Sequence, residues 1–90
     1  MADQINPKRA AMTVGIFAAV LHFLWAIIVA SGTGQQLADW KLGLHFLSNP
    51  YTIASFNIVT AVALIAAAFV GGAVLGWALA AVWNWTSKFK

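Results

Sequence analysis

The chain consists of a long apolar segment, a shorter segment of mixed polarity and a second long apolar segment. Charged side chains are missing from Ala10 to Ala38 and again from Leu42 to Ser87. The apolar run over residues 10–30 would form a helix about 31 Å long, which matches the hydrocarbon thickness of a bilayer, about 30 Å. We therefore predict one membrane span over residues 10–30 and a second over residues 57–83, whose greater length predicts tilt or protruding ends.

The segment between the spans has the pattern of a shorter, amphipathic helix. Apolar residues recur at helical spacing over about residues 35–47, and Asp39 and Lys41 lie among them. Such a mixture is typical of a helix that lies at a membrane surface, with a re-entrant loop as the alternative. The helix belongs to a predicted outer loop over residues 31–56, in which Gly32 suits a left-handed helix cap.

Polar tails flank the two spans, over residues 1–9 and 84–90. Asn6 can cap a helix that begins at Pro7, because proline suits the first helical position, and Asn57 can cap the second span. The pattern predicts a single membrane domain over residues 1–90. Its fold class is an all-α membrane protein, a two-transmembrane helical hairpin with a short interfacial helix in the connecting loop.

The composition agrees with a membrane environment. Hydrophobic residues make up 62% of the 90 residues and charged residues 8%, whereas a soluble domain carries about 25% charge. A soluble chain of this size cannot bury so much apolar surface. The net charge of +3 comes from basic residues divided among the tails and the loop, which form no patch for nucleic acid. The predicted partner is therefore the lipid bilayer.

The basic residues predict the orientation. Lys8, Arg9, Lys88 and Lys90 lie in the two tails, and only Lys41 lies between the spans. Because positive charge marks the cytoplasmic side, both termini are predicted to be cytoplasmic in a multi-pass protein. The first apolar run has 21 residues, longer than the 7–15 of a signal-peptide core, so we predict a span and not a cleaved signal.

Small residues recur every four positions in the second span and form one stripe of its helix. The first span offers small residues that can face them. Close helix packing is therefore predicted within the chain, between copies of it, or both. The predicted packing residues are Gly15, Ala19, Ala68, Gly72, Gly76 and Ala80.

His22 lies inside the first span, where an ionisable side chain is a functional hypothesis by default. The main interpretation is structural, with a hydrogen bond from His22 to a carbonyl or to Thr60, and a proton relay is another. The combination of Ala18, His22 and Trp25 resembles the pigment-binding helices of bacterial light-harvesting polypeptides. That resemblance implies bacteriochlorophyll or haem on His22, with Ala18 leaving room beside the ligand; otherwise no cofactor is expected.

Four short motifs, taken together, resemble a group of small bacterial membrane proteins with two spans. The resemblance implies a hairpin in the bacterial cytoplasmic (inner) membrane and assigns no catalytic role. The motifs are His22–Trp25, Leu44–Tyr51, Gly76-Trp77 and Trp83-Asn84.

The sequence does not predict an enzyme, because its only acids are Asp3 and Asp39 and it carries no hydrolase or phosphate-binding motif. We expect a structural or accessory subunit that self-associates or joins a larger membrane complex through its small-residue stripe. The alternatives are a tetrapyrrole-binding subunit of a photosynthetic or respiratory complex, with His22 as axial ligand, and an oligomeric pore or transporter component.

Overall fold

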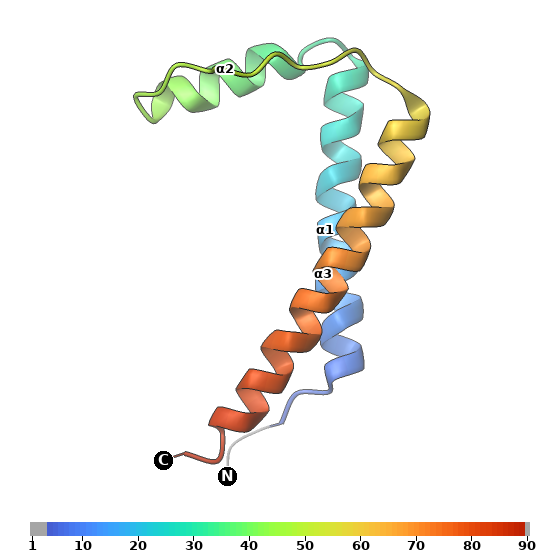
Figure 1. The fold of residues 1–90 in the computed structure, drawn as a ribbon, viewed down its shortest axis with the longest axis vertical. Coiled ribbons are helices and arrows are strands. Elements are labelled where there is room, and N and C mark those ends of the chain that lie inside the picture. The colour runs from blue at the N-terminus through green and yellow to red at the C-terminus, as the bar shows by residue number, and fades with distance from the viewer. Residues whose placement is uncertain (1–3, 90) are drawn as a thin grey trace.

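The computed structural model describes residues 4–89, which form three helices and no strand. Two long helices run antiparallel, side by side, and the short one projects sideways from the end of the hairpin opposite to the termini (Figure 1). The predicted all-α class is confirmed. Residues 1–3 and 90 of the predicted tails lie outside the described part. The helices are α1 (Pro7–Ala30), α2 (Gly34–Leu44) and α3 (Ile58–Thr86).

Within residues 4–89, α1 and α3 are the two helices that are long and apolar enough to cross a membrane. Both begin at an asparagine cap, as their sequences predict. The Asn6 side chain accepts hydrogen bonds from the backbone N–H groups of Lys8 and Arg9, and Asn57 accepts from Val59 and Thr60. Pro7 costs α1 no hydrogen bond, because the first N–H of a helix has no partner inside it.

The first two helices end in the same left-handed turn. After α1, Gly32 has a φ of 86°, and the N–H of Thr33 donates to the carbonyl of Ile28. After α2, Phe46 has a φ of 62°, and the N–H of Leu47 donates to the carbonyl of Leu42. Both turns are Schellman motifs, which satisfy carbonyls at the end of a helix.

The helix predicted over about residues 35–47 is therefore shorter than its periodicity suggested. It ends at Leu44 because the backbone reverses at Phe46, a residue with no intrinsic preference for that conformation. From there an extended segment runs back along α2 to the start of α3 (Figure 1). Helix α3 continues to Thr86, beyond the predicted end of the span at residue 83, because Asn84 does not interrupt the helical backbone hydrogen bonds.

Candidate functional site

The close contact between α1 and α3 is formed by small residues. Gly15 and Gly72 are buried, and a Cβ atom added to Gly72 would lie 2.8 Å from the carbonyl oxygen of Val14 and 3.0 Å from the Cα of Gly15. Since real Cβ contacts are almost never shorter than 3.0 Å, a glycine is needed here for the two backbones to approach this closely.

The same stripe continues toward the termini. A Cβ atom on Gly76 would meet the Ala10 carbonyl, with its carbon at 2.9 Å, and the Cβ of Val14 at 3.0 Å. Ala80 is 1% exposed, one turn further along. Of the other predicted packing residues, Ala19 and Ala68 are half-buried. The sequence left open whether the stripe packs within the chain, and in this structure Gly72 and Gly76 contact α1 of the same chain.

His22 is half-buried on α1, and its hydrogen bond stays within its own helix. The ring Nδ1 lies 2.8 Å from the carbonyl oxygen of Ala18. A carbonyl only accepts, so Nδ1 carries the proton and donates. His45 makes the same contact with the carbonyl of Lys41, also at 2.8 Å. Of the two partners that the sequence suggested for His22, the structure selects the carbonyl and not Thr60.

Ala18 does not leave a flat space beside His22. A Cβ atom on Gly72 would lie 2.9 Å from the Cβ of Ala18, so α3 occupies the position one turn before the imidazole. A porphyrin or chlorin on His22 needs that space for its ring. The packed hairpin therefore does not fit a tetrapyrrole at this position, although the Nδ1–H bond would leave Nε2 free to bind a metal.

Replacing His22 with either Gln or Leu is expected to lower the free energy of unfolding by about 1 kcal/mol or less, the net worth of one hydrogen bond. The reason is that the Ala18 carbonyl keeps its helical backbone partner when the imidazole is removed. Unfolding of the variants in mixed micelles measures this. A loss of several kcal/mol in His22→Leu, restored by His22→Gln, would contradict the assignment.

A polar network joins α2 to the extended segment that returns beneath it. The Gln35 amide accepts from the N–H of Ile53 at 2.6 Å and donates to the carbonyl of Tyr51 at 3.1 Å. Asp39 Oδ1 accepts from Gln35 at 2.9 Å and from Asn49 at 2.8 Å. These bonds place the return segment along α2, and the sequence analysis did not find them.

A second amide joins the two ends of the hairpin. Asn84 accepts from the N–H of Ile5 at 2.7 Å and donates to the carbonyl of the same residue at 2.8 Å. Beside it, the Gln4 side chain donates to Ser87 Oγ at 3.2 Å. The N-terminal segment is thus fixed against the last turns of α3. The only sequence signal was a polar amide between two tryptophans.

Replacing Asn84 with Leu should release the N-terminal segment, because Ile5 loses both backbone hydrogen bonds to that side chain. We expect the Ile5 amide to exchange with solvent about tenfold faster, as loss of one to two hydrogen bonds implies. Hydrogen exchange measured by NMR in micelles tests this. Thr86→Val is the matched control, since Thr86 bonds only to its own helix. Equally faster exchange of the Ile5 amide in both variants would contradict the proposal that Asn84 holds the N-terminal segment.

Among residues 4–89, no group of three or more His, Cys, Asp or Glu side chains is placed to hold a metal ion. No protein-family model, curated protein or solved structure matches the chain. The resemblance to small two-span bacterial membrane proteins therefore stays a prediction, and the functional argument depends on the geometry described above.

Proposed function

We propose that this chain is a small, non-enzymatic integral membrane protein that serves as a structural or accessory subunit. The observation that carries the proposal is the division of side chains in the hairpin. Small residues, together with the half-buried ring of Phe69 against Gly15, form the contact between α1 and α3, while large apolar side chains cover its outside, including Phe17 and Val74, each 64% exposed. Surfaces of this kind are stable against lipid or against another membrane subunit.

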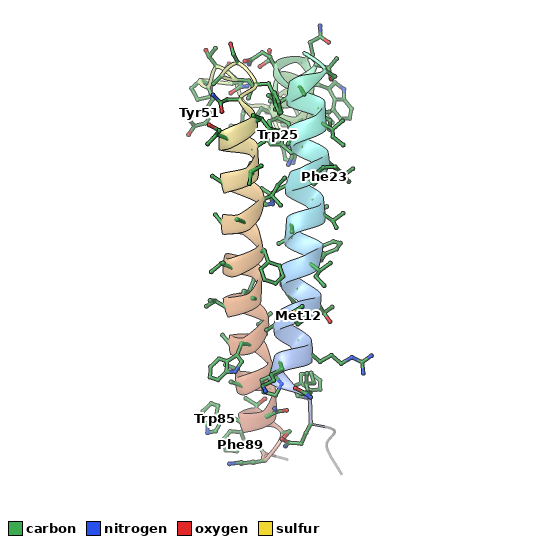
Figure 2. All side chains as sticks on the ribbon, turned by 90° about the vertical axis from the view of Figure 1, so that its right-hand side faces the viewer. Met12, Phe23, Trp25, Tyr51, Trp85 and Phe89 are labelled. Atoms are coloured by element: carbon green, nitrogen blue, oxygen red, sulfur yellow. The ribbon has the colours of Figure 1, made fainter. Side chains whose placement is uncertain are left out.

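Aromatic side chains support a transmembrane placement of the hairpin. Tyr51 lies at the end that carries α2, and Trp85 and Phe89 lie at the other (Figure 2). The last two rings pack edge to face with centroids 5.3 Å apart. Amphipathic aromatic residues favour the two membrane interfaces. We propose that the protein lies in the bacterial inner membrane with both termini in the cytoplasm.

The short helix α2 would then lie along the outer membrane surface. Figure 1 shows it projecting sideways from the hairpin, at the end opposite to the termini. At its tip, Phe46 is 98% exposed although its positive φ costs about 1–2 kcal/mol for a residue other than glycine. Trp40 and Leu47 are also exposed nearby in sequence. Insertion of this aromatic tip into the lipid interface would account for a strained, exposed phenylalanine.

Single cysteines test the orientation, because the chain has no native cysteine. In intact cells, Gln36→Cys is expected to react with an impermeant thiol reagent, and Ala2→Cys is expected to react only after the membrane is permeabilised. The physical reason is the excess of basic residues in the two tails. Protection of Gln36→Cys together with labelling of Ala2→Cys would reverse the orientation.

Association with other subunits is proposed to use the outer faces of the hairpin. In the single chain, Gly72 and Gly76 already contact α1, so the small-residue stripe is not free for a second helix. Extraction in mild detergent, followed by native gel electrophoresis and mass spectrometry, tests the proposal. We expect a colourless assembly heavier than one 9.6 kDa chain, with itself or a constant partner.

Two results would contradict this function. A chain that stays monomeric and retains no partner in mild detergent would not be an accessory subunit. A Soret or near-infrared absorption band that His22→Gln removes would instead favour the tetrapyrrole-binding alternative, because glutamine supplies no imidazole nitrogen to a metal.

A further inference from the structure

The fold gathers basic residues that are far apart in the sequence. Lys8 and Arg9 lie in the first turn of α1, and Lys88 follows the end of α3. The antiparallel hairpin brings these two ends of the chain together (Figure 1), and the two hydrogen bonds between Asn84 and the backbone of Ile5 hold them there. Three of the four basic residues that the structure describes therefore lie at one end of the molecule, which we call the basic end.

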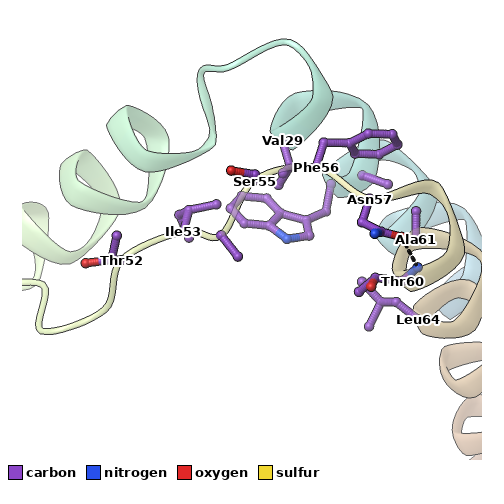
Figure 3. Close-up of a pocket in the computed structure, with 12 residues that line it drawn as sticks. Val29, Thr52, Ile53, Ser55, Phe56, Asn57, Thr60, Ala61 and Leu64 are labelled. Atoms are coloured by element: carbon purple, nitrogen blue, oxygen red, sulfur yellow. Dashed lines mark hydrogen bonds between the residues drawn. The ribbon is translucent and has the colours of Figure 1, made fainter.

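The charge at the basic end has no acidic counterpart among the described residues. Asp39 carries the one carboxylate side chain in that part of the chain, and it lies on α2, at the opposite end, together with Lys41. The open groove at that opposite end, whose lining includes Ile53 and Leu64, contains no charged side chain (Figure 3). Over the two polar tails the sequence has four basic residues and one acid. The hairpin is thus positive at one end and close to neutral at the other.

Interactions within α1 do not account for Lys8 and Arg9. The N-terminus of a helix carries a partial positive charge, so cations there are unfavourable, and the first turn of α1 has no acid to offset them. The backbone N–H groups of both residues already donate to Asn6 Oδ1, at 2.9 and 3.3 Å. An anion at this position would therefore be bound by the exposed ammonium and guanidinium groups, and not by free N–H groups of the helix.

Aromatic side chains place the basic end at the depth of lipid headgroups. Trp85 and Phe89 are exposed at the same end of the hairpin (Figure 2). Tryptophan favours the membrane interface, where the phosphates of phospholipids also lie. Long basic side chains reach that layer while their methylene stems stay along apolar surface. Positive groups and an aromatic anchor at one depth are complementary to a lipid with a negative headgroup.

We propose that the basic end binds anionic phospholipids, whose headgroup phosphate is not neutralised by an amine. The Arg9 guanidinium would pair with the phosphate in a bidentate manner, and the ammonium groups of Lys8 and Lys88 would add charge without a fixed geometry. Zwitterionic phospholipids are bound more weakly, because their own ammonium group competes for the phosphate. The inference rests on the membrane placement proposed above and is independent of the accessory role.

Quenching of tryptophan fluorescence by brominated phospholipids in vesicles tests the lipid preference. The reporter variant keeps Trp85 alone, with the other four tryptophans changed to phenylalanine. The quencher is phosphatidylglycerol or phosphatidylcholine, brominated on the acyl chain close to the headgroup and used at equal mole fraction. The association constant for phosphatidylglycerol is expected to be about fivefold higher, the effect of one basic residue at an anionic surface. A control reporter keeps Trp40 alone, on the neutral α2, and should show a difference of less than about twofold.

Substitutions in the Trp85 reporter test which charges are responsible. Lys8→Gln combined with Arg9→Gln should reduce the preference to less than about twofold, whereas Lys8→Arg combined with Arg9→Lys should keep it, because the charge is conserved. Lys41→Gln is the matched control at the other end of the hairpin and should leave the preference unchanged. Raising the salt from about 0.1 to about 1 M should also remove it, because the Debye length falls from about 10 to about 3 Å.

Three results separate this proposal from those on which it does and does not rest. Equal quenching of Trp85 by the two lipids, or a preference that survives the removal of both charges on α1, would overturn it. Absence of quenching by either lipid would overturn the membrane placement and this proposal with it. A chain that is monomeric in mild detergent but keeps the lipid preference would support the lipid site and contradict the accessory role alone.

Discussion

Replacing Gly76 with alanine is expected to lower the free energy of unfolding of the hairpin by about 1–3 kcal/mol, the usual cost of overpacking a close contact. The added Cβ would meet the backbone of Ala10, whose carbonyl carbon would be 2.9 Å away, and the Cβ of Val14 at 3.0 Å. A backbone cannot move aside as the end of a flexible side chain can. The helices must therefore separate locally.

Gly72→Ala is expected to act in the same way, because its Cβ would lie 2.8 Å from the Val14 carbonyl oxygen. Leucine at both glycines should separate α1 from α3 altogether. The measurement is energy transfer between dyes on cysteines placed at residues 2 and 88, followed as the detergent is made denaturing. The transfer falls when the two ends of the hairpin part.

Gly71 provides a matched control one residue away. A Cβ atom there would meet nothing within 4 Å. Because alanine is the better helix former, Gly71→Ala should leave the hairpin unchanged or stabilise it by up to about 1 kcal/mol. Equal destabilisation by Gly71→Ala and Gly72→Ala would show that helix propensity, and not the contact with α1, controls the effect.

The sequence predicts those features of the fold that depend on neighbours along the chain. Asparagine before a helix and glycine after one are recognised because the capping partners lie two to five residues away, as at Asn6, Asn57 and Gly32. The apolar runs predict the two long helices for a similar reason, since length and composition suffice. Phe46 is the exception, because an aromatic residue in the left-handed conformation has no local signature.

The features that the sequence does not predict are contacts between distant residues. The Gln35 amide bonds to the backbone at residues 51 and 53, and the Asn84 amide to the backbone at residue 5. A backbone partner is the same at every position, so no residue pattern marks which one an amide will reach. The groove lined by Trp25, Ile53 and Leu64 likewise depends on how three separate segments meet.

Replacing Gln35 with Leu is expected to detach the return segment from α2. The Gln35 side chain makes three hydrogen bonds, to Asp39, to the Tyr51 carbonyl and from the Ile53 N–H. Their combined loss is worth about 2 kcal/mol, or about a thirtyfold increase in local opening. Hydrogen exchange at the Ile53 amide measures this directly, because that N–H loses its acceptor in the variant.

The neighbouring glutamine supplies the control. Gln36 is exposed, and the described structure gives its side chain no hydrogen bond. Gln36→Leu should therefore leave the Ile53 exchange rate within about twofold of the wild type, because the hydrogen bonds to Tyr51 and Ile53 come from Gln35. If both variants accelerated exchange equally, added hydrophobicity on α2 would be the cause. If neither did, the return segment would be held by apolar contacts such as that of Ile53 beside Gly34, where an added Cβ would lie 3.6 Å from the isoleucine methyl.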